Sequence, residues 1–221
     1  MNEEALRQEL CRVGRSLFER GYVHATAGNI SVRLPDDSGF LITPTDACLG
    51  FLSPDRLAKV HVQGPQVSGD RASKTLALHR RIYDAEPLAR CVIHTHSTHL
   101  VALTLQDVPA PGADLIPPLT PYFVMKVGHV PLIAYRRPGD PTVGDLVAQA
   151  IAQARDRGKP IRSVMLERLG PNVWHETPAA AMATLEELEE TARLWLLSGK
   201  TAPALEAAQL DELRQVFGAA W

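Results

Sequence analysis

The residues with the clearest capacity for chemistry are two histidines separated by one residue. His94 and His96 lie in the run VIHTHS (92–97), at the end of an apolar stretch. Side chains of an extended strand alternate between its faces, so both imidazoles would point the same way, a little under ~7 Å apart along the backbone. Two such rings can bind one metal ion at roughly 2.0–2.1 Å, whereas a lone histidine is more often a hydrogen-bonded core residue. A metal site normally needs a third protein ligand, which another part of the chain must supply.

The elements that must position this pair follow from periodicity and turn signals. Apolar residues at helical spacing predict helices, and short apolar runs between Gly, Pro and Asp predict strands. The expected helices span 3–20, a short segment from Ser53-Pro54, 74–87 with Ser73 as its cap, a segment from about 98, 141–158, 178–198 and 203–217. The expected strands span 29–34, 39–44, 58–64, 90–96, 129–136, 161–169 and 171–176, the last two joined at Gly170-Pro171.

These helices and strands interleave, yet some neighbouring strands form hairpins. The turn PDDSG (35–39), for example, joins the first two strands. We therefore expect a mixed sheet covered by helices rather than a strictly parallel sheet. No linker, low-complexity tract or repeat divides the chain, so residues 1–221 are predicted to form a single α/β domain.

The composition argues against several classes of protein. A formal net charge of -2 offers no broad basic field, so we expect no nucleic-acid partner. The three cysteines are odd in number and form no C-x-x-C pair, which argues against disulfides and against a cysteine zinc site. The opening MNEEALRQEL is charged, unlike a signal segment, and no run approaches 18 apolar residues. We therefore expect a cytoplasmic protein that does not enter a membrane.

Four stretches in a fixed order carry a family resemblance. They read TAGNISVRL (26–34), LITPTD (41–46), SKTLALHRRIY (73–83) and VIHTHSTHLVAL (92–103). Together they resemble the class II aldolase/adducin family over residues 5–198. Within it, the branch of 3-oxo-tetronate 4-phosphate decarboxylases is the most similar, on residues 73–74, 96–103, 117–140 and 186–197.

The resemblance implies a fold, a cofactor and an assembly. The fold is a three-layer α/β/α sandwich with a mixed, mostly antiparallel central sheet. The cofactor is a divalent metal, with zinc as the first expectation. The assembly is a homotetramer with sites at subunit interfaces, and the substrate is a small sugar phosphate or sugar acid.

The same resemblance points to residues that bind an anionic group. Gly28 and Asn29 after Thr26 suit a tight turn that receives a phosphate on backbone and side-chain donors. The hydroxyls of Thr43, Thr45 and Ser73 would add donors, and Lys74 would add a cation and a candidate catalytic group. The alternative is structural: a turn glycine, strand threonines and a helix cap.

Two further segments have both a functional and a structural interpretation. Tyr122 is a proton-transfer candidate, because a tyrosine from a neighbouring subunit has that role in the aldolases; otherwise it is a packed aromatic residue. The acids of LEELEETARLWLL (185–197) are expected on a solvated helix face. Its apolar residues at helical spacing are expected to pack: Leu185, Leu188, Ala192, Trp195 and Leu196.

The sequence departs from the family pattern at two positions. Leu169 stands where the third metal-binding histidine is expected, with Arg168 at the preceding asparagine. Leucine cannot coordinate a metal ion. Thr75 stands where the family has an acid/base glutamate, with His79 four residues on supporting this register, and a threonine hydroxyl is a poor base near neutral pH.

Other residues could complete the metal site. Glu167 lies two residues before Leu169, on the same face of the expected strand, and a carboxylate can bind zinc. However, two residues displace the backbone by about 6.5 Å, and Arg168 could pair with Glu167 or bind an anion. His175 and His99 are further candidates.

The leading hypothesis is a metal-dependent lyase, most simply a 3-oxo-tetronate 4-phosphate decarboxylase. Retro-aldol cleavage needs a base to remove a hydroxyl proton, whereas decarboxylation of a β-keto acid needs mainly an electron sink and a later proton donor. Thr75 therefore argues more strongly against an aldolase, although the decarboxylases of the family also carry the glutamate. One alternative is a catalytically degenerate binding or assembly module, like adducin's head domain. Another is an aldolase with altered active-site chemistry.

Overall fold

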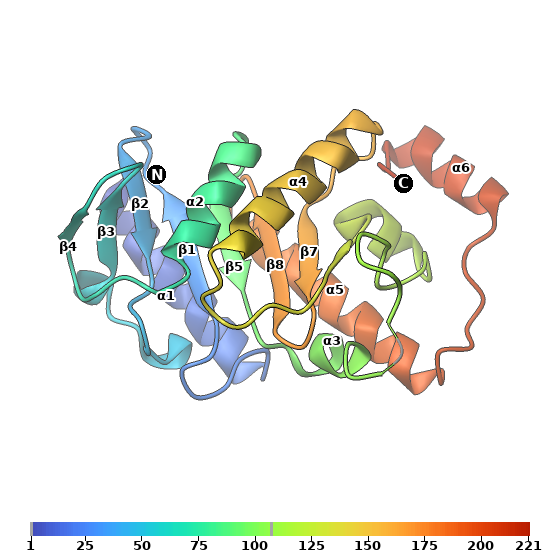
Figure 1. The fold of residues 1–221 in the computed structure, drawn as a ribbon, viewed down its shortest axis with the longest axis horizontal. Coiled ribbons are helices and arrows are strands. Elements are labelled where there is room, and N and C mark those ends of the chain that lie inside the picture. Colours follow the sequence, from blue (N-terminus) through green and yellow to red (C-terminus); the bar gives the residue numbers. More distant parts are fainter. Residues whose placement is uncertain (1, 107) are drawn as a thin grey trace.

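The computed structural model describes residues 2–106 and 108–221. Its described part contains one eight-stranded sheet with helices on both faces (Figure 1). The strands are β1 (Asn29–Arg33), β2 (Gly39–Ile42), β3 (Ala58–His61), β4 (Gln66–Ser68), β5 (Cys91–His94), β6 (Leu132–Ile133), β7 (Ser163–Leu166) and β8 (Gly170–His175). The helices are α1 (Glu3–Glu19), α2 (Leu76–Ala85), α3 (Thr98–Leu103), α4 (Thr142–Asp156), α5 (Pro178–Leu197) and α6 (Ala207–Phe217). Three short helical turns complete the set: η1 (Leu49–Phe51), η2 (Pro54–Arg56) and η3 (Phe123–Val127).

The sheet is mostly antiparallel. Its strand order is β4-β3-β2-β1-β5-β8-β7-β6, and β6 with β7 is the parallel pair. Figure 1 views the sheet from the face covered by α2 and α4, with α1 and α5 on the opposite face. The expected three-layer α/β/α sandwich with a mixed, mostly antiparallel sheet is confirmed.

The alternation of side chains along β5 builds two cores. Ile93 packs in the core under α1 and α5, whereas Val92 packs in the core under α2 and α4. His94 follows Ile93, so its side chain lies on the α2 side of the sheet. At this point His94 is paired with Asn29 of β1 on one side and Asn172 of β8 on the other.

Local sequence signals place several elements correctly. Helix α1 begins after Asn2, whose side chain accepts a hydrogen bond from the Ala5 backbone at 2.9 Å, and it ends just before Gly21. The expected hairpin is present, with Ser31 of β1 opposite Ile42 of β2. In α5, the predicted packing residues are buried or partly buried against the core.

Other expectations are wrong in detail. Helix α2 starts at Leu76 with Thr75 as its N-cap residue, so Ser73 does not cap it. The turn between β7 and β8 comprises residues 167–169, and Gly170 already belongs to β8. The expected strand 129–136 is reduced to β6, because Leu132 and Ile133 alone pair with β7.

The expectation that the acids of α5 lie on a solvated face is wrong at Glu189. Glu189 is buried rather than solvated, because its carboxylate accepts hydrogen bonds from the start of α3.

Among the described residues, no helix is long and apolar enough to cross a membrane.

Candidate functional site

A cavity of about 380 Å³ opens at the ends of β1 and β5 and at the start of α2. Residues from several loops complete its wall. The lining residues are Thr26, Ala27, Gly28, Asn29, Pro44, Thr45, Asp46, Ser73, Lys74, Thr75, His94, His96, Pro138, Gly139 and Leu169. The structure thus brings together most of the candidate residues, although they lie in segments far apart in the chain.

His94 is held in an orientation that suits a metal ligand. Its ring is buried, and its Nδ1 donates a hydrogen bond to the Pro171 carbonyl oxygen at 2.8 Å. Because a carbonyl oxygen can only accept, Nδ1 carries the proton and Nε2 keeps a free lone pair. Burial lowers the pKa of His94 to about 4, so the imidazole is neutral near pH 7.

His96 lies just beyond the end of β5. The ring centroids of His94 and His96 are 5.1 Å apart, as the strand spacing predicted for side chains on one face. Burial, and then the charge of His24, lower the pKa of His96. The proximity of His24 was not foreseen, since this residue lies about 70 positions away in a loop before β1.

Two glycines allow the neighbouring strands to approach this end of β5. Gly28 has φ +83°, and a Cβ there would lie 2.8 Å from the His94 carbonyl oxygen. Gly170 has φ +138°, and a Cβ there would lie 1.9 Å from the Thr95 carbonyl oxygen. Any side chain at either position would push β5 away and displace the histidines.

The cavity wall also carries hydroxyl groups and a cation. The Ser73 and Thr75 hydroxyls are 2.9 Å apart, and Ser73 Oγ also accepts from the Thr75 backbone. Lys74 Nζ lies 3.8 Å from an Asp46 carboxylate oxygen, with both side chains well exposed. Asp46 is the single carboxylate among the cavity-lining residues, and it adopts the left-handed conformation with φ +57°. Sequence reasoning missed Asp46, although its place in LITPTD was visible.

Three predicted site residues lie elsewhere. Thr43 is buried, and its hydroxyl accepts a hydrogen bond from the Ile30 backbone at 3.2 Å, so it supports the β1–β2 pair. Tyr122, a residue that is 64% exposed, precedes η3 and does not line the cavity. Glu167 also lies outside the cavity wall; its carboxylate accepts from the Tyr135 backbone at 2.8 Å and lies 3.8 Å from Arg168.

The position of Glu167 has a local cause. Strand β7 ends at Leu166, and Arg168 takes the left-handed conformation with φ +60° in the turn that follows. The alternation expected of a straight strand therefore does not apply between 167 and 169. The structure gives no support to Glu167 as the third ligand.

The two alternative histidines are also engaged away from the cavity. His99 Nδ1 is 2.8 Å from a Glu189 carboxylate oxygen. His175 is paired with Cys91 at the other end of β5, and its Nε2 accepts from Arg162 at 2.6 Å.

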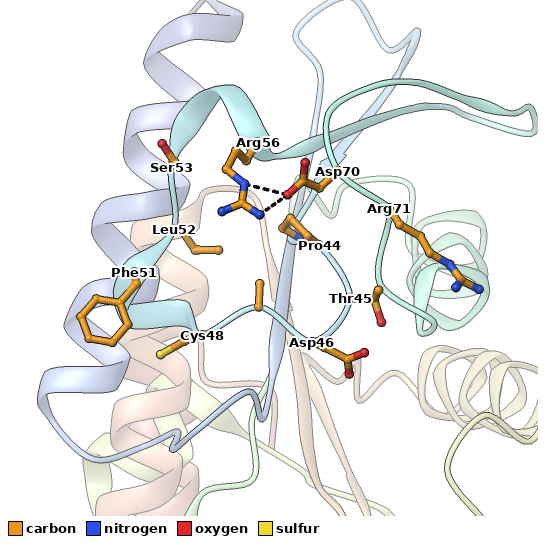
Figure 2. A pocket seen from close by; sticks show the side chains of 11 residues that line it. Pro44, Thr45, Asp46, Cys48, Phe51, Leu52, Ser53, Arg56, Asp70 and Arg71 are labelled. Carbon is orange, nitrogen blue, oxygen red and sulfur yellow. Dashed lines mark hydrogen bonds and ion pairs between the residues drawn. The ribbon is translucent and has the colours of Figure 1, made fainter.

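A second cavity of about 410 Å³ adjoins the first (Figure 2). The two share the loop segment Pro44, Thr45 and Asp46. Arg56 and Asp70 both line the second cavity and form an ion pair at 2.6 Å, drawn with dashed lines in Figure 2. Its lining includes no histidine, so the metal-binding candidates belong to the first cavity.

Comparison with known proteins agrees with this architecture. The model of the class II aldolase and adducin N-terminal domain matches residues 8–196. The chain belongs to this family. A 3-oxo-tetronate 4-phosphate decarboxylase from Cupriavidus necator is 55% identical over 99% of both chains, and one from Escherichia coli is 40% identical over 96% of both.

Solved structures of the class II aldolase family have the same fold. YgbL from Klebsiella pneumoniae superposes with a TM-score of 0.85 at 42% identity, covering 97% of this chain and 100% of the other. An L-fuculose 1-phosphate aldolase gives a TM-score of 0.80 at 21% identity, covering 96% and 95%, which is evidence of a common fold alone.

Within this class II aldolase domain, both unusual residues line the cavity. Leu169 and Thr75 stand in the wall beside His94, where the family resemblance implies a histidine and a glutamate. This placement supports the match to the family motifs that puts Leu169 at the histidine position and Thr75 at the glutamate position. Both departures therefore lie in the candidate site and not on a distant surface.

The residues present fit a two-histidine metal site. His94 and His96 lie side by side with lowered pKa values, and His94 directs a free lone pair away from its backbone partner. Within residues 2–106 and 108–221, no group of three or more His, Cys, Asp or Glu side chains could hold a metal ion. A bound ion would therefore take its remaining ligands from water or from a substrate.

Proposed function

We propose that this protein is a metal-dependent lyase that decarboxylates a 3-oxo-tetronate 4-phosphate. The observation that carries the proposal is the meeting of His94, with its free Nε2, and the anion-binding candidates Asn29, Ser73 and Lys74 in one cavity. The names of the relatives that match the chain from end to end support the same substrate.

The two ends of such a substrate call for different surroundings. The phosphate needs donors and positive charge, which the amide of Asn29, the hydroxyl of Ser73 and the ammonium of Lys74 supply. The loop containing Thr26 and Gly28 adds backbone donors at the same end of β1. Leu169 also lines the cavity, and we place the carboxylate that leaves as CO₂ beside its apolar side chain.

The chemical step makes modest demands on this chain. The bond between the carboxylate carbon and its neighbour breaks, and its electron pair moves onto the ketone oxygen. When bound to His94 and His96, a divalent ion would supply Lewis acidity toward that oxygen. Lys74 adds a positive charge beside the cavity that favours this movement of charge, and the carbon left behind then takes up a proton. No base is required to start the reaction, so Thr75 is compatible with it.

Several finer features belong to the same proposal. We take zinc as the ion and a homotetramer as the assembly. In such an assembly, the exposed Tyr122 would serve a neighbouring subunit's cavity as a proton donor. We also place the protein in the cytoplasm, a reducing compartment in which its three free cysteines would persist.

The test compares metal content and CO₂ release in matched histidine variants. His94→Ala should lose the bound divalent ion and at least about a hundredfold in turnover, the usual scale for losing electrostatic stabilisation of the reacting oxygen. His61→Ala, on the exposed end of β3, should retain both properties. Purified wild-type protein without a divalent ion, together with unchanged turnover in His94→Ala, would refute the proposed mechanism.

A second function is favoured by Leu169 and Thr75. These residues remove a metal ligand and a base from the cavity, as expected of a family member that binds a sugar phosphate without converting it. Calorimetry distinguishes the two functions: tight binding of sugar phosphates without turnover of decarboxylase or aldolase substrates would establish the binding module.

A third function, an aldolase with altered chemistry, is favoured by Asp46. Its carboxylate lies in the cavity wall and could act as the base that Thr75 cannot provide. If the wild-type protein cleaves a ketose phosphate and Asp46→Asn does not, the aldolase activity is supported over decarboxylation.

A further inference from the structure

Four buried side chains form a chain of hydrogen bonds that ends at the cavity. Tyr83 OH lies 2.9 Å from Ser31 Oγ, which lies 2.7 Å from His79 Nδ1. On the other side of the ring, His79 Nε2 lies 2.6 Å from Asn29 Oδ1. All four residues are buried, and of these four Asn29 alone lines the cavity.

The direction of each hydrogen bond follows from the two ends. Burial raises the pKa of Tyr83, so its hydroxyl keeps its proton, and burial lowers the pKa of His79 to about 3, so its ring carries a single proton. Asn29 Oδ1 can only accept, which puts the ring proton on Nε2. His79 Nδ1 must then accept from Ser31, and Ser31 must accept from Tyr83.

The reverse direction leaves a buried donor without a partner. If the Asn29 amide were rotated, its NH₂ would donate to His79, the ring would donate to Ser31, and Ser31 would donate to Tyr83. The buried Tyr83 hydroxyl proton would then have no acceptor, because Ser31 is its hydrogen-bond partner among the described residues. A buried unsatisfied donor is costly, so the forward direction is preferred.

The forward direction determines what Asn29 presents to a ligand. Its oxygen is occupied by His79, while its NH₂ group has no protein partner in the part of the chain that the structure describes. We propose that Tyr83, Ser31 and His79 are positioning residues that orient the Asn29 amide as a hydrogen-bond donor toward an anionic ligand group. The inference rests on the proposed function in that it takes this group to be the substrate's phosphate.

The first experiment measures binding of inorganic phosphate by calorimetry, without any need for turnover. Tyr83→Phe removes the terminal donor but keeps the ring stacked on Phe40, at 4.7 Å between centroids, so the variant should fold. It should weaken phosphate binding about three- to tenfold and raise KM with little change in kcat, the pattern expected of lost ground-state binding. Ser31→Ala should do the same.

A matched serine provides the control for Ser31→Ala. Ser163 on β7 is equally buried, and its hydroxyl has no partner among the described residues. Ser163→Ala should leave phosphate affinity unchanged. At the ring position, His79→Leu should lose affinity, and His79→Gln, which can still donate to Asn29, should recover part of it.

A double-mutant cycle separates positioning from general packing. In an Asn29→Ala background, Tyr83→Phe should cause no further loss of phosphate affinity, because the group through which it acts is gone. Additive losses in the double mutant, or wild-type phosphate affinity in Tyr83→Phe and Ser31→Ala, would overturn the positioning role but leave the proposed function standing. A wild-type protein that binds neither inorganic phosphate nor a sugar phosphate would overturn the proposed function as well.

Discussion

At the scale of single residues, Leu169 stands in the cavity wall beside the two histidines. Replacing it with histidine would place a third imidazole at this position, and zinc sites normally have three or four protein ligands. Leu169→His should therefore tighten zinc binding about tenfold or more, or ~1.4 kcal/mol. Calorimetric titration of metal-free protein measures the change. Leu169→Asn, which introduces a polar group but a poor zinc ligand, should not show it; equal affinity in Leu169→His and wild type would contradict the geometry.

If Lys74 binds an anionic ligand as proposed, the carboxylate of Asp46 competes with that ligand for it. Their ion pair spans 3.8 Å between exposed side chains and so contributes little to stability. Asp46→Asn removes the negative charge that repels an anionic ligand, and asparagine tolerates the left-handed conformation. Phosphate affinity should rise about two- to fivefold at low salt, the size of an exposed ion pair, and this gain should shrink as salt is added. Asp156→Asn, at the exposed end of α4, is the control, and weaker phosphate binding in Asp46→Asn would argue that the carboxylate has a direct role.

At the scale of elements, α5 anchors α3 through a buried carboxylate. Glu189 accepts hydrogen bonds from the backbones of His99 and Leu100, at 2.9 and 3.1 Å. Helix α3 begins shortly after His96, so this contact also supports one side of the cavity. Glu189→Gln should lower the free energy of unfolding by about 1.5–3 kcal/mol, as measured by urea denaturation. The neighbouring exposed change Glu190→Gln should stay within about 0.5 kcal/mol, and similar values for both variants would show that the buried contact is dispensable.

At the scale of the whole molecule, buried neutral histidines make folding sensitive to acid. The pKa of His79 falls from 6.5 to about 3, first through burial and then through the charge of His94. Between these values the unfolded chain binds a proton that the folded chain does not, so stability is retained above pH 6.5 and decreases as the pH falls toward 3. The unfolding free energy of metal-free wild type should therefore decrease more steeply from pH 7 to 4 than that of His79→Gln. Parallel curves would show that His79 takes up its proton as readily in the folded protein as in the unfolded chain.

Local pattern was enough to predict most of the framework. The periods of helix and strand depend on neighbouring residues, so α1 and the shared face of His94 and His96 followed from spacing. The β1–β2 hairpin followed from the turn residues PDDSG. The family motifs also indicated the register at Thr75 and Leu169, which the structure places in the cavity wall. The assembly, the metal and the roles of these residues stay predictions.

The sequence by itself thus determined the layered α/β fold, the paired histidines and the two positions that depart from the family pattern. The tertiary structure decided which remaining polar groups meet. It placed Glu167 outside the cavity, buried Glu189 under α3, and joined His79 to Asn29 across 50 residues of chain. The physical reason is that hydrogen bonds between distant segments depend on turn geometry and packing, which no local periodicity records.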